Sequence, residues 1–232
     1  MKAIVVTDQA AGTAGMTLVE RPEPEAAGND VLVEVHASGF TPGELTWPSN
    51  WADRLGRDRT PSIPGHELAG VVSALGYGTA GLSVGQRVFG LTDWTRDGTL
   101  AEYTAVEARN LAPLPGDVDF TVGASLPISG LTAWQGLFEH GRLRAGQSVL
   151  VHGAAGGVGS MVTQLAREAG ATSSAPDELP TGRPRSTSAR RSSSTSRTTP
   201  WRMSAESIWC SMSSAETSRS GPRVWFGPEE RW

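Results

Sequence analysis

The sequence predicts an α/β plus β protein, with a β-rich first domain, the opening strand–helix unit of an α/β domain, and an irregular last segment. Short strand-like segments separated by glycine and proline fill residues 1–118. Within 119–171, a β-like stretch turns through glycines into a helical pattern. Residues 172–232 are rich in serine and arginine. These three observations set the expected domain boundaries.

The composition excludes several classes of protein. Among the 232 residues, no stretch of about 18 apolar residues predicts a membrane span, and the first residues lack a basic and then apolar export pattern. The single cysteine, Cys210, excludes a disulfide framework and a four-cysteine zinc site. A net charge of −4 gives no reason to expect nucleic acid as a partner. We therefore expect a cytoplasmic protein without a membrane or nucleic-acid partner.

The N-terminal part shows the pattern of an antiparallel, barrel-like sheet. Residues 31–37 alternate apolar and polar side chains, as a half-buried strand does. Residues 38–64 are rich in proline, tryptophan and charge, which predicts a long surface loop. The remaining expected strands are 2–7, a turn and strand over 64–75, 85–91 and 99–106. Helical pieces are expected over 120–140, interrupted at Pro127 and Gly130.

The most informative stretch is the glycine-rich turn at 153–159. Residues 148–152 form a short apolar, β-like run, and apolar residues recur at helical spacing from Met161 onward. Gly153, Gly156 and Gly159 lie between them. A strand that turns through glycines into a helix lets backbone N–H groups and the positive helix end face a pyrophosphate. The pattern predicts dinucleotide binding, and a tight strand–helix turn without a ligand is the alternative.

Five segments together resemble a known family. In chain order they are IPGHELAGVV, GQRVFG, GTLAEY, LPISGLTAWQGLF and VLVHGAAGGVG. This order resembles the medium-chain dehydrogenase/reductase superfamily, in its zinc-independent, quinone oxidoreductase-like branch, over residues 1–171. The resemblance implies a GroES-like β-barrel catalytic domain at 1–118, followed by the start of a Rossmann domain at 119–171. It further implies NADPH, hydride transfer to a small-molecule electron acceptor such as a quinone or an activated alkene or carbonyl, and a homodimer.

The resemblance also assigns cofactor-binding positions but no catalytic residue. They are Thr41, Thr132 and the turn residues Gly153, Ala154, Ala155, Gly156, Gly157, Val158 and Gly159. Relatives often have asparagine at the position of Thr41, and a helix N-cap or a polar core residue is the alternative for Thr132. The two tyrosines, Tyr77 and Tyr103, are explained by strand packing, and for a quinone the proton can come from water.

His66 and Glu67 resemble the GHE motif of the zinc-dependent members of the superfamily. Where those relatives place a cysteine before glycine, this chain has Ser38 before Gly39, and a neutral hydroxyl is a poor zinc ligand. We therefore expect no metal, with His66 and Glu67 in a buried turn that satisfies local hydrogen bonds. Trp47, Trp51 and Trp94 lie on expected loops, where they either line an aromatic acceptor pocket or pack a long loop.

Residues 172–232 differ in kind from the rest of the chain. They contain 15 serines, three residues drawn from Ile, Leu and Val, and a net charge of +3, against −7 for residues 1–171. Such a stretch buries too little apolar surface to offset its ordering entropy, which predicts an irregular or disordered tail. An alternative treats the arginine- and serine-rich run 183–197 as an RNA-binding or phosphorylated segment, and the protein as a binding module.

We interpret the tail as the product of a frameshift near Ala171. Read one base earlier, a TCN serine codon becomes NTC, which encodes only Phe, Leu, Ile or Val. Residues 172–179 then permit YVIGTGRA, a second strand that ends with an arginine and no acidic residue, as expected for NADPH rather than NADH. On this interpretation the chain lacks most of its Rossmann domain, so we expect weak or absent NADPH binding and an impaired or inactive protein.

Overall fold

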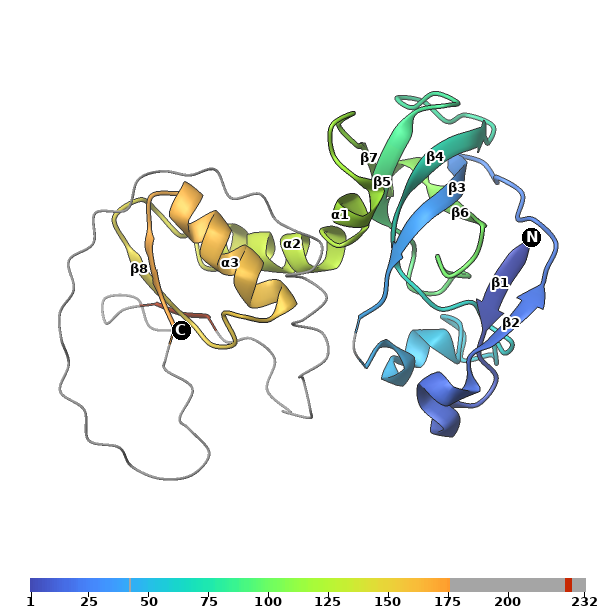
Figure 1. Ribbon diagram of the computed structural model, residues 1–232, viewed down its shortest axis with the longest axis horizontal. Coiled ribbons are helices and arrows are strands. Elements are labelled where there is room, and N and C mark those ends of the chain that lie inside the picture. The colour runs from blue at the N-terminus through green and yellow to red at the C-terminus, as the bar shows by residue number, and fades with distance from the viewer. Residues whose placement is uncertain (42, 176–223, 227–232) are drawn as a thin grey trace.

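The computed structural model describes residues 1–41, 43–175 and 224–226. A sheet-rich part and a smaller part built around two helices and a short sheet lie side by side, with α1 (Phe120–Ala124) between them (Figure 1). Within the described residues, every helix is too short or too polar to cross a bilayer.

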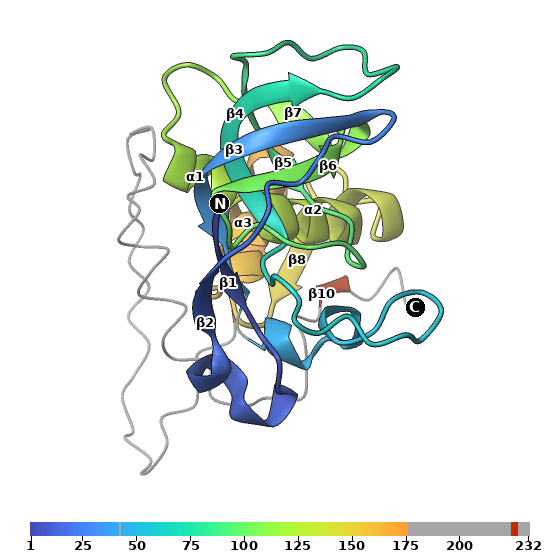
Figure 2. The same cartoon turned by 90° about the vertical axis from the view of Figure 1, so that its right-hand side faces the viewer.

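A five-stranded antiparallel sheet forms the centre of the first part, in the order β6-β3-β4-β5-β7. Its strands are β3 (Asp30–Gly39), β4 (Glu67–Leu75), β5 (Arg87–Leu91), β6 (Tyr103–Glu107) and β7 (Leu111–Pro113). A hairpin of β1 (Lys2–Val5) and β2 (Thr17–Glu20) lies beside it (Figure 2). The Ile4 amide donates to the Leu100 carbonyl over 2.8 Å, which ties the hairpin to the residues before β6. The expected strands therefore form, and β2 and β7 are added to them.

The sheet is stabilised by apolar side chains on both of its faces. On one face, the buried cluster is Val31, Val33, Leu68, Val72, Val88 and Val106. On the other face, Ala69 packs with Leu114 and with Ala124 of α1. Because successive residues of a strand point to opposite faces, Leu68 and Ala69 serve different clusters. Consequently β4 is buried on both sides over its first residues.

The loop between β3 and β4 is ordered by short helical turns and its own hydrogen bonds. Two 3-10 turns, Glu44–Thr46 and Pro48–Asn50, follow β3, and two more lie at Gln9–Gly15 and Ala108–Asn110. The Asn50 side-chain amide donates to the Glu44 carbonyl, and the Trp51 indole N–H donates to the Leu45 carbonyl, each over 2.7 Å. Trp51 therefore packs the loop, which is one of the two roles considered for it.

The second part begins with α1, whose first turn is capped by Asp119 accepting from the Thr121 amide over 2.8 Å. Next come α2 (Pro127–Trp134), a π-helical turn (Gln135–His140), β8 (Ser148–Val151) and α3 (Gly157–Glu168). Proline at the start of α2 suits a position that needs no amide donor. The expected interruption at Gly130 is wrong: its amide donates to the Leu126 carbonyl within the helix.

The core of the second part lies between α2, α3 and β8. Its buried residues are Ala133, Leu137, Leu143, Val149, Val151, Met161, Val162 and Ala166. They come from one face of α3 and from the buried positions of β8, whose apolar residues alternate with less buried ones. Thus β8 and α3 form the expected strand–helix unit, with the helix beginning four residues earlier than its apolar pattern indicates.

Two short strands flank β8. Thr172–Ser174 forms β9, parallel to β8, and Val224–Phe226 forms β10, antiparallel to it. The expectation that the chain is irregular from residue 172 is therefore wrong for β9 and for β10, because ladder hydrogen bonds need an extended backbone and not apolar side chains. Arg183–Arg197 and Cys210 lie outside the described residues.

Candidate functional site

The glycine-rich turn connects β8 to α3 through a backbone that requires glycine. Gly153 has a φ of +71°, in the left-handed region where side chains are strained. A methyl group added at Gly159 would lie 2.0 Å from the Gly153 carbonyl oxygen, so the helix packs directly on the turn. The Gly156 amide closes the turn by donating to the Gly153 carbonyl over 2.9 Å. These contacts explain the spacing of Gly153, Gly156 and Gly159.

The first turn of α3 is able to bind an anion. Gly156 is the N-cap residue and offers no side chain to cap the helix. The amides of Gly157, Val158 and Gly159 precede the first intrahelical bond, from the Ser160 amide to the Gly156 carbonyl. Those amides and the positive end of the helix dipole attract a phosphate group. Ala155 is exposed at the same turn, whereas Ala154 and Val158 pack against the core.

Helix α2 lies beside this turn. A methyl group added at Gly157 would lie 3.1 Å from the Ser129 hydroxyl of α2, so the two helices approach closely there. Thr132 is exposed in the same helix. Because Leu126 occupies the N-cap position and Thr132 is exposed, neither alternative considered for Thr132 applies. The structure thus brings the turn and the helix of Thr132 together.

Buried polar groups gather at the end of the barrel sheet around Glu44. This carboxylate is fully buried and accepts from the Gly65 amide over 2.7 Å and from the Thr41 amide over 3.1 Å. Its Oε1 also lies 2.7 Å from Nδ1 of His66, whose side chain is equally buried. Consequently Thr41 is held by its backbone in this cluster.

The donor groups near His66 do not fit a catalytic zinc ion. Such an ion needs about three protein ligands. The Ser38 hydroxyl is hydrogen-bonded to the Thr99 hydroxyl over 2.7 Å, and Nδ1 of His66 is bonded to Glu44. Residues 1–41, 43–175 and 224–226 contain no group of three His, Cys, Asp or Glu side chains arranged to bind a metal. The hydrogen bonds of His66 are those expected for a buried turn.

Glu67, the first residue of β4, is buried like its neighbour His66. Its Oε1 accepts from the Ile128 amide over 2.7 Å. Burial raises the pKa of Glu67 to about 7, and the negative charge of Glu44 adds to this, against the opposing effects of the Ile128 hydrogen bond and His66. The Glu67 carboxyl group is therefore placed to exchange a proton near neutral pH.

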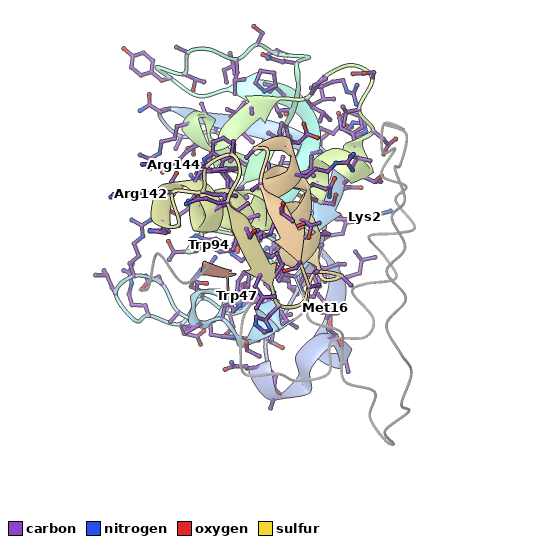
Figure 3. The ribbon with its side chains drawn as sticks, turned by 90° about the vertical axis from the view of Figure 1, so that its left-hand side faces the viewer. Lys2, Met16, Trp47, Trp94, Arg142 and Arg144 are labelled. Atoms are coloured by element: carbon purple, nitrogen blue, oxygen red, sulfur yellow. The ribbon has the colours of Figure 1, made fainter. Side chains whose placement is uncertain are left out.

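Two tryptophans cover the His66 side of the cluster. The rings of Trp47 and Trp94, both labelled in Figure 3, meet edge to face with centroids 5.2 Å apart. The Trp94 ring lies 4.7 Å from the His66 ring. Together with Ser49 the two tryptophans line a hollow of about 290 Å³. Although Trp94 is large and apolar, 43% of its surface is exposed. The two rings therefore present an open aromatic surface.

Sequence reasoning missed the residues that organise this cluster. Glu44 lies in a loop whose composition predicts exposure, and its burial depends on partners that are distant in the sequence, such as Gly65 and His66. Thr92 is also buried, and its hydroxyl has no hydrogen-bond partner in the described part of the protein. No local pattern marks either residue.

Residues 27–116 match the alcohol dehydrogenase GroES-like domain family. The chain is 40% identical to rat quinone oxidoreductase over 147 residues, which are 63% of this chain and 44% of the relative. A mycobacterial protein solved in complex with NADPH superimposes with a TM-score of 0.67 at 30% identity, over 78% of this chain and 54% of that one. For the CurK enoyl reductase the TM-score is 0.67 at 26% identity, over 75% and 53%.

Residues 27–116 thus belong to the alcohol dehydrogenase GroES-like domain family, and the matches support a relationship of the chain to the quinone oxidoreductase-like branch of the medium-chain dehydrogenase/reductase superfamily. The chain spans about half the length of the curated relatives it matches. Its described fold, a GroES-like domain followed by the start of a Rossmann domain, is the one predicted from the sequence.

Proposed function

We propose that the protein is an oxidoreductase, impaired in the present chain, that binds NADPH at the turn from Gly153 to Gly159 and transfers hydride to a small-molecule acceptor. The acceptor class is a quinone or a similar activated alkene or carbonyl compound. The observation that supports this most directly is the first turn of α3, where three amides after the glycine turn have no intrahelical hydrogen-bond acceptor. The reduced nicotinamide supplies the hydride, and the protein supplies binding and orientation.

The residues of the turn fit a dinucleotide. The missing side chains at Gly156 and Gly157 let the Gly153 carbonyl and the Ser129 hydroxyl approach the helix end, and Gly156 offers no side chain to cap it. Thr132, exposed in the neighbouring helix, and Thr41, at the barrel end, are proposed as contacts for the nicotinamide half. NADPH rather than NADH is proposed from the arginine in the shifted reading of 172–179 and from the NADPH complex of the mycobacterial relative.

The surface formed by Trp47 and Trp94 is proposed as the acceptor site. A hollow of about 290 Å³ lined by two indole rings suits a planar aromatic molecule, since such rings gain stacking energy as well as apolar contact. No described side chain is assigned as a proton donor, and water can protonate a reduced quinone. The described residues therefore contribute positioning and an aromatic surface.

The experiment that tests the cofactor site changes one exposed residue of the turn. Ala155→Asp places a negative charge at the positive helix end, where it repels a diphosphate, whereas Ala155→Asn has nearly the same shape without the charge. In the chain translated in the earlier frame, we expect the aspartate variant to raise the Kd for NADPH about tenfold or more, and the asparagine variant to change it little. Equal affinities of the two variants, measured by NADPH fluorescence, would contradict the proposal.

A second candidate function is enoyl reduction, which uses the same cofactor on a different acceptor. The similarity to the CurK enoyl reductase favours it. Assays of NADPH oxidation with a naphthoquinone and with an enoyl thioester separate the two. Faster turnover of the enoyl thioester would replace the quinone assignment and leave the cofactor site unchanged.

We further propose that residues beyond Ala171 are encoded in a shifted reading frame. The support is the strand-like sequence YVIGTGRA, with β-branched apolar residues, that the earlier frame permits over 172–179. Resequencing the coding DNA around the Ala171 codon tests the frame directly. On this proposal the present chain needs millimolar NADPH for binding, whereas the chain translated in the earlier frame binds it in the micromolar range. Micromolar affinity of the present chain would refute this part.

A further inference from the structure

Glu67 connects two parts of the fold that otherwise have separate cores. It is the first residue of β4 in the barrel sheet, and 3% of its surface is exposed. Its Oε1 accepts the amide hydrogen of Ile128, the second residue of α2, over 2.7 Å. The two residues are 61 positions apart in the sequence. A side chain of the sheet thus binds the N-terminal turn of a helix in the other part.

The cores on the two sides of this hydrogen bond are distinct. Helix α1 packs on the barrel sheet, where Ala124 joins the cluster of Ala69 and Leu114. Helix α2 contributes Ala133 to the cluster that contains α3 and β8. Only residues 125 and 126 separate the two helices along the chain. The Glu67–Ile128 hydrogen bond therefore lies at the junction of the two parts.

The surroundings of Glu67 keep its carboxyl group in place. A methyl group added at Gly39 of β3 would lie 2.6 Å from Oε2 of Glu67 and 2.7 Å from the Ala124 carbonyl oxygen. Glycine at position 39 is thus required for the carboxyl group and the end of α1 to approach β3. Since Gly39 is also the register partner of Glu67 in the sheet, the backbone fixes where the side chain begins.

The ionisable groups that influence Glu67 are one carboxylate and one imidazole, which act in opposite directions. Glu44 is the nearby negative group and His66 the nearby basic group, both from the barrel end. The neighbours from β3, α1 and α2 are backbone groups of Gly39, Ala124 and Ile128. The positive end of α2 attracts a carboxylate, whereas burial and Glu44 oppose it. The two protonation states of Glu67 therefore interact differently with α2.

We propose that Glu67 is a positioning residue that attaches α2, and with it Thr132, to the barrel sheet, and that protonation of Glu67 alters this attachment. The attachment itself does not depend on the cofactor. Its consequence for Thr132 rests on the proposed function, because Thr132 is a proposed nicotinamide contact. The proton on Glu67 is thereby linked to the placement of one side of the cofactor site.

The test observes the Ile128 amide by NMR in the full chain. We expect its signal to shift with pH at a midpoint near neutral in the wild-type protein and to lose that titration in Glu67→Gln. In Glu67→Leu, which removes the acceptor, hydrogen exchange of this amide should be about tenfold faster or more. The Leu143 amide, bonded to the Leu137 carbonyl in the same part, serves as the control.

Two results would overturn the proposal: an Ile128 signal that does not titrate, or an exchange rate in Glu67→Leu equal to that of the wild type. If Glu67→Leu does not fold, the comparison of wild type with Glu67→Gln decides alone. The same spectra recorded with NADPH separate this proposal from the proposed function. Titration of Ile128 without any response of the glycine turn to NADPH supports the attachment and contradicts the cofactor site.

Discussion

Replacing Glu67 with glutamine tests the energetic consequence of its burial. In the folded protein the pKa of Glu67 is raised to about 7 from its ordinary value of 4.5, chiefly by burial. Glutamine has nearly the same shape and retains an oxygen that can accept from the Ile128 amide, but it does not titrate. The substitution therefore removes the proton equilibrium and leaves most of the packing.

The sign and size of the effect follow from proton linkage. Because the folded protein binds this proton more tightly than the unfolded chain, the stability that it provides is fully present below pH 4.5 and is lost as the pH rises through about 7. The difference between those two values corresponds to about 3 kcal/mol. Deprotonation then leaves a buried charge near Glu44, which the glutamine variant lacks.

The assay is urea unfolding of both proteins over a series of pH values, followed by far-ultraviolet circular dichroism. Subtracting the wild-type free energy of unfolding from that of Glu67→Gln cancels the other titrating groups, provided that the urea slopes agree. We expect this difference to rise by about 3 kcal/mol between pH 4.5 and pH values above 7. A difference that does not change with pH would refute the reasoning.

Three further substitutions test the packing and the acceptor site. Gly39→Ala should destabilise the fold by about 1–3 kcal/mol in urea unfolding, because the added methyl group meets two oxygen atoms. Gly116→Ala, where the methyl group meets no other atom, should change stability by less than about 0.5 kcal/mol. Leu137→Ala, at a fully buried site, should lower the free energy of unfolding by about 2–5 kcal/mol. Leu131→Ala, half exposed in α2, should lower it by less than about 1 kcal/mol, and equal losses would contradict the core assigned to Leu137. Trp94→Ala should raise the KM for a naphthoquinone about five- to tenfold and should raise the KM for a short aliphatic enone by a smaller factor. Equal changes of the two KM values would contradict an aromatic acceptor site.

The strands and the glycine turn were predictable because their patterns are local. Alternation over 31–37 and the glycine spacing at 153–159 each determine structure within a few residues. The errors arose where packing against neighbouring helices or strands determines the secondary structure. Gly130 remains helical because α2 is packed against α3, and Thr172–Ser174 forms a strand because β8 offers a free edge. Neither influence is visible in the residues themselves.

The candidate site was predictable at the turn and not at the barrel end. The amides that would bind a diphosphate are backbone groups, so the glycine pattern suffices to find them. By contrast, Glu44 is buried through contacts with Gly65 and His66, more than 20 residues away in the sequence. The link from Glu67 to Ile128 spans an even longer separation. Such contacts become visible only when the chain is folded.

The most direct test of the central claim is an NMR titration of the full chain with NADPH. If the glycine turn binds the diphosphate, the amide signals of residues 153–159 shift progressively as NADPH is added, and inorganic pyrophosphate shifts the same signals. The amides of β6, on the far edge of the barrel sheet, remain unchanged in that case. Shifts confined to other residues, or signals at 153–159 that stay fixed even in the chain translated in the earlier frame, would contradict the assignment of the cofactor site.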